Sequence, residues 1–313
     1  MEKYTIAIIF SLLSCFSYSS EINFLIPAGE GGGWDTTARE AGKALVKEGL
    51  IDNANFINFP GGGGGRALVE LVNNESNHQN TLMVQSTPLI LRKLTGVIPM
   101  GFRDIRPISL MIAEFEVIVV KADSTIKTLD DFVQSAKNNP KGTGIVGGSA
   151  KGSLDHIAAA LLYKSAGLDI KTIRYAASDG GGDALQKLKD DIGVALVTGY
   201  GEVVNELANG SLRALAISSD EPVAGIDIPT FRSQGYDVVF ANWRGFFAPN
   251  TISEEKANEY KDLLTKLSES KTWAEARGRY GWASFVRQDD ALIEFLESQD
   301  TDITEILNEL EMI

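Results

Sequence analysis

Five glycine-rich segments are the part of the sequence best suited to holding a ligand. They are residues 29–33, residues 61–65, Gly147 and Gly148 with Gly152, residues 180–182, and Gly199 with Gly201. Each is predicted to follow a strand and precede a helix, so its backbone N–H groups can point at an anion. In open α/β sheets that edge is where ligands bind. The alternative is that these glycines only form tight turns, but five segments in corresponding places favour a ligand cleft.

Ser149, Asp155 and His156 are the residues that could form a hydrolytic triad. The run Gly147-Gly148-Ser149-Ala150-Lys151 is close to a nucleophile elbow, but Lys151 stands where the pattern requires glycine. Adjacent residues of a helix point about 100° apart, so Asp155 is poorly placed to orient the His156 ring. We therefore predict that the chain is not an enzyme, and a secreted α/β hydrolase remains the less favoured alternative.

Three other side chains are candidates for ligand contact. Trp34 directly follows three glycines and is expected to wall a pocket rather than to enter a core. Arg244, beside Trp243, could bind a carboxylate through its fork of N–H groups or form a salt bridge between domains. His156 is either a packed, hydrogen-bonded side chain or a donor that faces the ligand. The sequence leaves the last two choices open.

Charge and residue counts exclude several functions. The chain has 29 Lys and Arg against 42 Asp and Glu, a formal net charge of −13, which argues against nucleic acid as a partner. Cys15, His78 and His156 are its only cysteine and histidines, too few for a Cys/His zinc site or an iron–sulfur cluster. We predict neither a metal nor a cofactor.

Residues 1–20 have the pattern of a signal peptide. Lys3 and the N-terminal amine precede an apolar run over residues 4–16, and small residues follow. The run is shorter than the roughly 20 residues that a helix needs to cross a bilayer. Simple cleavage, lipidation of Cys15 in a lipobox-like Leu12-Leu13-Ser14-Cys15, and a first buried element are the alternatives. We predict a periplasmic protein.

Short β-rich runs alternate with helical patterns, which predicts an α/β fold around a mainly parallel sheet. Strands are expected at residues 22–26, 55–59, 81–85, 116–120, 144–146, 172–175, 194–197, 212–217 and 238–248, and helices at 35–48, 66–72, 128–138, 153–166, 183–190 and 202–208. The chain after Ser253 is predicted to be helical.

The length of 313 residues predicts two domains, at roughly 150 residues each. No linker rich in Pro, Ser or Gly separates them, so their connections are expected to be strands. We predict a discontinuous domain I over residues 21–121 and 243–313 and a domain II over 122–242. The crossings near Lys121 and Asn242 would act as a hinge that a ligand closes.

Several motifs occur in order along almost the whole mature chain. They are residues 24–39 with the run Gly31-Gly32-Gly33-Trp34-Asp35, then Gly147-Gly148-Ser149, Asp155-His156, Gly199-Tyr200-Gly201-Glu202, residues 212–216, Ile228-Pro229-Thr230 and Asn242-Trp243-Arg244-Gly245. Together they closely resemble the periplasmic substrate-binding proteins of tripartite tricarboxylate transporters, also called Bug proteins, and the tricarboxylate-binding branch in particular. Residues 60–66 and 85–88 depart from the family pattern.

The resemblance implies a two-domain, type II-like periplasmic-binding-protein fold with two crossover strands and a ligand cleft between the domains. It also implies a receptor that captures a di- or tricarboxylate such as citrate and delivers it to the permease subunits of an inner-membrane transporter. A carboxylate sensor for a signalling kinase is the alternative, and we expect a monomer. Ligand contacts are expected, largely through backbone amides in the first loop, from Gly31, Gly32, Gly33, Trp34, Asp35, Ser86, Thr87, Gly148, Ser149, Gly152, Ser153, His156, Tyr200, Trp243 and Arg244.

Overall fold

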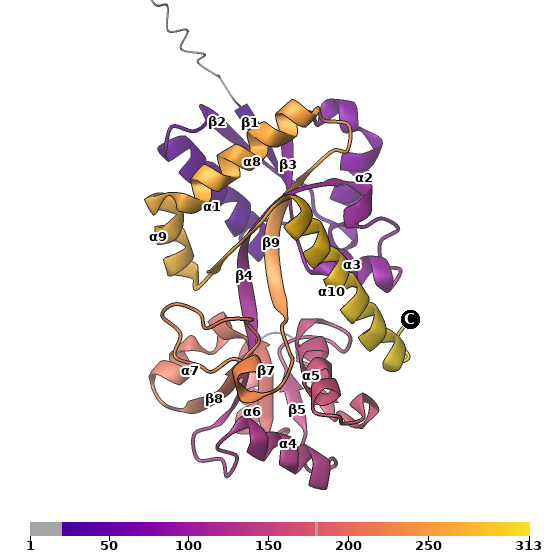
Figure 1. Ribbon diagram of the computed structural model, residues 1–313, viewed down its shortest axis with the longest axis vertical. Helices are drawn as coiled ribbons and strands as arrows, with labels where there is room; N and C mark the ends of the chain where they lie inside the picture. The colour runs from indigo at the N-terminus through magenta and orange to yellow at the C-terminus, as the bar shows by residue number, and fades with distance from the viewer. Residues whose placement is uncertain (1–20, 179–180) are drawn as a thin grey trace, which may run out of the picture.

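The computed structural model describes residues 21–178 and 181–313. The predicted signal peptide with Cys15, and Gly180 of the fourth glycine segment, lie outside the described residues. The elements form an upper and a lower group in Figure 1, which we call the first and the second lobe. Within the described residues, no helix is long and apolar enough to span a membrane.

The first lobe is built on a mixed sheet. Its strands, in spatial order, are β2 (Asn53–Asn58), β1 (Glu21–Ile26), β3 (Thr81–Ser86), β9 (Ala241–Ala248), β4 (Arg106–Lys121) and β10 (Ala283–Arg287). Its helices are α1 (Gly33–Lys47), α2 (Gly65–Asn73), α3 (Pro88–Leu94), α8 (Glu254–Glu269) and α9 (Lys271–Tyr280). The strands β1, β2 and β3 are parallel, so the loops that follow them meet at one end of the lobe.

The second lobe repeats this plan with fewer strands. Its strands are β8 (Leu212–Ile217), β4, β7 (Ala195–Gly199), β5 (Ile145–Gly147) and β6 (Tyr175–Ala176), and its helices are α4 (Leu129–Asn138), α5 (Leu154–Ser165), α6 (Gly181–Lys189) and α7 (Val204–Ala208). Thr128 begins α4 with a capping box to Asp131. Strands β5, β6 and β7 are parallel, so their following loops also share one end.

Three elements connect the lobes. Strand β4 pairs with β9 and β10 along its first part and with β7 and β8 over its last residues, so it belongs to both sheets. Strand β9 enters the first lobe beside it (Figure 1). Helix α10 (Asp289–Glu309) contacts both α3 of the first lobe and α5 of the second. The domain boundaries expected from the sequence stay a prediction.

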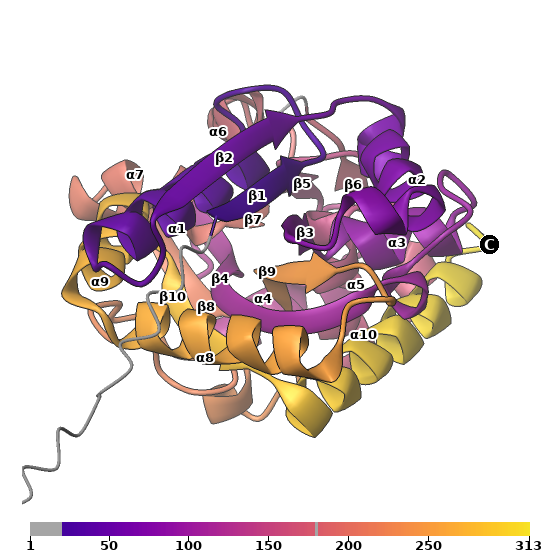
Figure 2. The ribbon, with the colours of Figure 1, turned by 90° about the horizontal axis from the view of Figure 1, so that it is seen from above.

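Apolar side chains form separate cores on the two sides of the first-lobe sheet. One core joins α1, α8 and α9 to the strands, and these three helices lie together on one side in Figure 2. The other joins α2, α3 and α10 and continues into α4 and α5 of the second lobe. Helix α10 therefore covers the junction of the lobes with a continuous apolar face.

The structure confirms the α/β alternation and corrects five details. The sheets are mixed rather than mainly parallel, because β4 and β9 run antiparallel to their neighbours. Residues 283–287 form the edge strand β10, although the chain after Ser253 was expected to be helical. A 3₁₀ turn at Ile170–Thr172 overlaps the start of the strand expected at 172–175, and strand β6 begins only at Tyr175. Strand β4 begins ten residues earlier than expected. The short helix α3 was not predicted.

Candidate functional site

Buried polar atoms without hydrogen-bond partners concentrate where the lobes meet. The described residues contain nine such side-chain atoms, and three of them lie on β4 and β9: Glu116 Oε2, Asn242 Oδ1 and Arg244 Nη1. Glu114 lies opposite Asn242 in the register of β4 and β9. Since side chains alternate along a strand, Glu114, Glu116, Asn242 and Arg244 share one face of the two strands. Unpaired buried polar groups are costly, so several on one face mark a place where a ligand can satisfy them.

The N-terminus of α1 lies above this face. Gly32 is the N-cap and makes no side-chain cap, and the amides of Gly33, Trp34 and Asp35 have no acceptor among the described residues. Gly31 adopts a φ of +85°, which glycine tolerates, and donates its own amide to Asp35 Oδ2 at 2.9 Å. Three free N–H groups at a helix N-terminus attract a negative charge.

Asp35 organises this loop from inside. Burial raises the pKa of its carboxyl, but hydrogen bonds from the Gly31 amide, Asn58 and Arg39 outweigh burial and hold the pKa below its ordinary value. Asp35 is 3 % exposed, so its carboxylate supports the loop and does not face solvent.

Arg244 adds a positive charge directly beneath α1. A Cβ on residue 33 would lie only 2.7 Å from Arg244 Nη2, so glycine at this position permits the close approach. The guanidinium pairs with Glu114 at 2.5 Å and lies 5.8 Å from the centre of the Trp282 ring. Arg244 is 9 % exposed, and its Nη1 remains unpaired. We call Arg244 and the three α1 amides the anion anchor.

The second lobe presents carboxyl groups to the same region. Asp155 and Glu116 contact each other, and Glu202 lies close to both; we call these three residues the acid cluster. Burial raises the pKa of Glu116 well above its ordinary value, and the charge of Asp155 adds to the effect. Burial also raises the pKa of Asp155. Two carboxyls in contact share a proton, which these directions place on Glu116.

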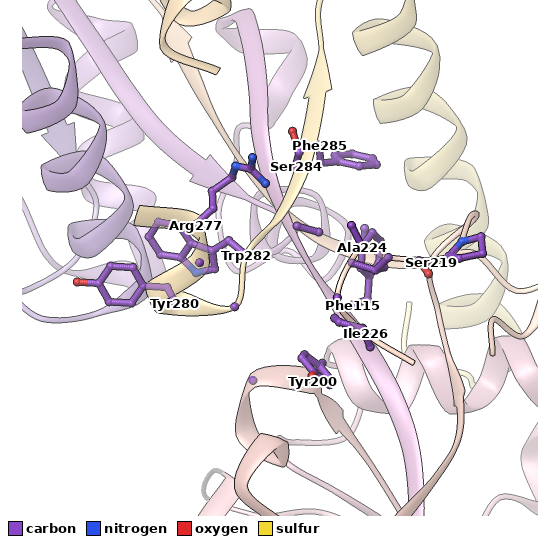
Figure 3. A pocket seen from close by; sticks show the side chains of 18 of the residues that line it. Phe115, Tyr200, Ser219, Ala224, Ile226, Arg277, Tyr280, Trp282, Ser284 and Phe285 are labelled. Carbon is purple, nitrogen blue, oxygen red and sulfur yellow. The ribbon is translucent and has the colours of Figure 1, made fainter. Parts of the chain in front are cut away.

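A cavity of about 980 Å³ opens beside this face, between the lobes. In Figure 3, Arg277, Tyr280 and Trp282 of the first lobe line one side and Tyr200 of the second lobe lies at the other, with Phe115 of β4 between them. Tyr280 stacks on Trp282 with ring centres 4.6 Å apart. Trp282 also contacts Arg244, so the cavity adjoins the anion anchor.

The structure brings together many of the residues that the sequence singled out. Gly31, Gly32 and Gly33 form the turn into α1, and Trp34 Nε1 donates to Ser86 Oγ at 2.8 Å. Gly148 lies against Thr198 and Glu202, and Ser149 donates to Asp155 and contacts Ser153. Tyr200 lines the cavity, and Arg244 lies in the anion anchor.

Four expected contact residues lie away from this space. Trp243 is fully buried and donates to Gln299 of α10 at 2.5 Å, and Thr87 is fully buried and donates to the Ala241 carbonyl. Gly152 lies against Met312 at the C-terminus. His156 packs on Tyr175 with ring centres 4.5 Å apart, and among the described residues it has no hydrogen bond to Ser149 or Asp155. The triad geometry therefore does not form.

His156 is held as a neutral acceptor. Burial, followed by the charge of Lys151, lowers its pKa to about 4, and its Nδ1 accepts the Gly152 amide at 3.0 Å. The folded pKa lies below the ordinary 6.5, so the unfolded chain binds protons more readily. The stabilisation from neutral His156 is complete above about pH 6.5 and is lost as the pH falls towards 4.

We expect the His156 ring signals in an NMR titration of the folded protein to remain those of the neutral form from pH 7 to pH 5. The His156→Gln variant assigns the signals and should lose less unfolding free energy than the wild type between pH 6.5 and pH 4. A midpoint near 6.5 in the folded protein would contradict the buried neutral state.

Sequence reasoning missed most of the polar face. Glu114, Glu116, Asn242, Arg277 and Trp282 were not proposed as site residues. The signal for two of them was present: Glu114 and Glu116 interrupt the apolar run of residues 110–120 at a spacing of two residues, which places both on one face.

Comparison with known proteins identifies the family. A family model described as "Tripartite tricarboxylate transporter family receptor" matches residues 43–312. The chain belongs to this receptor family. Its members are periplasmic binding proteins, so the family resemblance and the periplasmic-binding-protein fold expected from the sequence are confirmed.

Relatives of this receptor match it over most of its length, and two of them are solved structures with its fold. Protein BugT of Bordetella pertussis is 23 % identical over 284 residues, 89 % of this chain and 85 % of BugT. The TctC solute-binding protein from Polaromonas is 22 % identical with a TM-score of 0.84, covering 94 % of this chain and 100 % of that one. MatC from Rhodopseudomonas palustris, solved with bound malate, is 18 % identical with a TM-score of 0.66, covering 92 % and 99 %.

Proposed function

We propose that this receptor captures an organic acid between its lobes and delivers it to the membrane permease of a tripartite tricarboxylate transporter. The observation that carries the proposal is the anion anchor: the Arg244 guanidinium lies against Gly33 at the N-terminus of α1, where three amides are free, and its Nη1 is buried and unpaired. A carboxylate can accept from the guanidinium and from helix amides at the same time. Malate in the related MatC structure is a ligand of this chemical class.

Both lobes supply contacts in this proposal. Arg244, Gly33 and Trp34 hold the carboxylate on the first lobe, while Gly148, Ser149 and Tyr200 approach from the second. A ligand that contacts both lobes favours a closed form over an open one, because only the closed form completes the set of contacts. Closure about β4 and β9 would then give the permease a conformation that signals a loaded receptor.

We expect organic acids, and not simple anions, to stabilise the receptor. A thermal-shift screen of organic acids, with and without an amino group, should identify a ligand that, at 100 times its dissociation constant, adds about 2.7 kcal/mol to the free energy of unfolding. Sodium sulfate at equal ionic strength is the control, because it screens charge without presenting a carboxylate. Stabilisation by sulfate equal to that by every acid would reject a carboxylate receptor.

A further inference from the structure

The acid cluster lacks the cations that normally accompany buried carboxylates. Glu116 and Asp155 are 3 % and 5 % exposed, and neither forms an ion pair with a Lys or Arg among the described residues. Glu202 has no such ion pair among the described residues, and Arg244, whose guanidinium lies nearby, pairs with Glu114. Arg277 of the cavity lining has a buried, unpaired Nε and forms no ion pair with these acids in the described part of the chain. Buried charges are ordinarily paired, so the acid cluster has uncompensated negative charge even with one proton shared between Glu116 and Asp155.

The hydroxyl groups of Ser149 and Thr198 already donate to the acid cluster. Ser149 Oγ donates to Asp155 Oδ2, and Thr198 Oγ1 donates to Glu202 Oε2. Their protons are therefore not offered to a ligand carboxylate, and Glu116 Oε2 has no donor from any described residue. The acid cluster therefore accepts hydrogen bonds, whereas the anion anchor donates them.

The anion anchor and the acid cluster therefore favour opposite charges on one ligand. The unpaired, nine-tenths buried Arg244 Nη1 points to a carboxylate at the first lobe, independently of the acids. A second carboxylate placed against Glu202 and Asp155 would meet like charges, which costs several kcal/mol in a desolvated interface. An ammonium group has three N–H donors and a positive charge, so it can donate hydrogen bonds to the acid cluster and compensate its charge.

We propose that the ligand is a carboxylic acid that also carries a protonated amine, with its carboxylate on the anion anchor and its ammonium group against Glu202 and the acid cluster. This inference rests on the proposed carboxylate-receptor function and specifies its substrate class. Glu202 is the contact residue of the cluster, because it is exposed while Glu116 and Asp155 lie behind it.

A metal ion bridging a polycarboxylate to the acids is a separate way to supply positive charge. No group of three His, Cys, Asp or Glu residues in the described part of the chain has an arrangement that could hold a metal ion. The ammonium group needs no such arrangement, since hydrogen bonds to one or two carboxylates suffice. Titrations in the presence of EDTA distinguish the two sources of charge.

The test is calorimetric titration of the full mature chain with pairs of acids that differ only by an amine. The pairs are aspartate and succinate, glutamate and glutarate, and γ-aminobutyrate and butyrate, which vary the spacing between the charges. In at least one pair the amino acid should bind tenfold or more tightly than its partner, with EDTA present.

Two variants connect the preference to the acid cluster. Glu202→Gln should weaken the amine-bearing ligand about tenfold and leave its amine-free partner unchanged or tighter. The matched control Glu206→Gln removes one charge on the neighbouring helix α7, from a residue that is not part of the acid cluster, and should preserve the preference.

The outcomes separate this inference from the proposed function. Amine-free acids that bind as tightly as their amine-bearing partners in all three pairs, or a preference that survives Glu202→Gln, would overturn the ammonium assignment and leave the carboxylate receptor intact. Binding abolished by EDTA would assign the positive charge to a metal and also overturn it. Binding of no acid in the screen or in these titrations would reject the proposed function itself.

Discussion

Replacing Arg244 by alanine should weaken binding of the cognate acid by about 30-fold to 1,000-fold or more. Truncating one partner of a buried, hydrogen-bonded charge pair costs roughly 2–5 kcal/mol, and each 1.4 kcal/mol is a factor of ten in the dissociation constant. Arg244 supplies a buried, unpaired N–H group beneath α1, and a neutral side chain cannot replace it. Calorimetric titration with the ligand found in the thermal-shift screen measures the loss.

The substitution also removes the partner of Glu114. The double variant Arg244→Ala/Glu114→Gln removes that unpaired charge, and it should remain as weak a binder as the single variant if the guanidinium itself holds the ligand. Arg106→Ala is the matched control, since Arg106 lies on β4 and pairs with Glu254 at 2.5 Å away from the anion anchor. Wild-type affinity in a folded Arg244→Ala protein would place the carboxylate elsewhere.

Trp243→Ala should lower the free energy of unfolding by about 3–5 kcal/mol, the range typical of a large aromatic side chain removed from a core. Trp243 is fully buried, contacts Phe247 with ring centres 5.9 Å apart, and donates its indole N–H to Gln299. The truncation leaves a cavity and a buried amide without one of its partners. Denaturant unfolding followed by circular dichroism measures the change.

Tyr280→Ala provides the comparison for Trp243→Ala. Tyr280 is 42 % exposed and stacks on Trp282 at the surface of the cavity, so its removal should cost about 1 kcal/mol or less. Equal losses in the two variants would mean that Trp243 does not anchor the junction of β9 with α10. A small loss for Trp243→Ala alone would mean that the surrounding core can collapse around the vacancy.

The position of Trp243 gives a structural sense to the run Asn242-Trp243-Arg244-Gly245. Successive residues of a strand point to opposite faces, so Trp243 enters the core beneath α10 while Asn242 and Arg244 face the space between the lobes. Gly245 completes the run, because a Cβ there would lie 2.4 Å from the Ser109 carbonyl oxygen of β4. One short run thus fastens the two connecting strands and presents the anion-binding arginine.

Local patterns in the sequence were sufficient for most elements of the fold. The glycine segment before Trp34 predicted a helix N-terminus, and α1 begins at Gly33 with three amides unpaired. Alternation of apolar runs with helical patterns predicted the α/β class, because strands and helices leave different short-range periodicities. The order of the motifs along the chain was sufficient to suggest the receptor family.

Features that depend on distant partners were decided by the tertiary structure alone. Residues 283–287 become a strand only because β4 offers its edge, and the long α10 crosses between the lobes only because both present apolar surface to it. The acid cluster is the clearest case: residues 116, 155 and 202 are far apart in sequence, and folding brings their carboxyl groups together. The desolvation that raises the pKa of Glu116 and Asp155 exists only after packing, since burial and charge proximity are properties of the folded chain and not of local sequence.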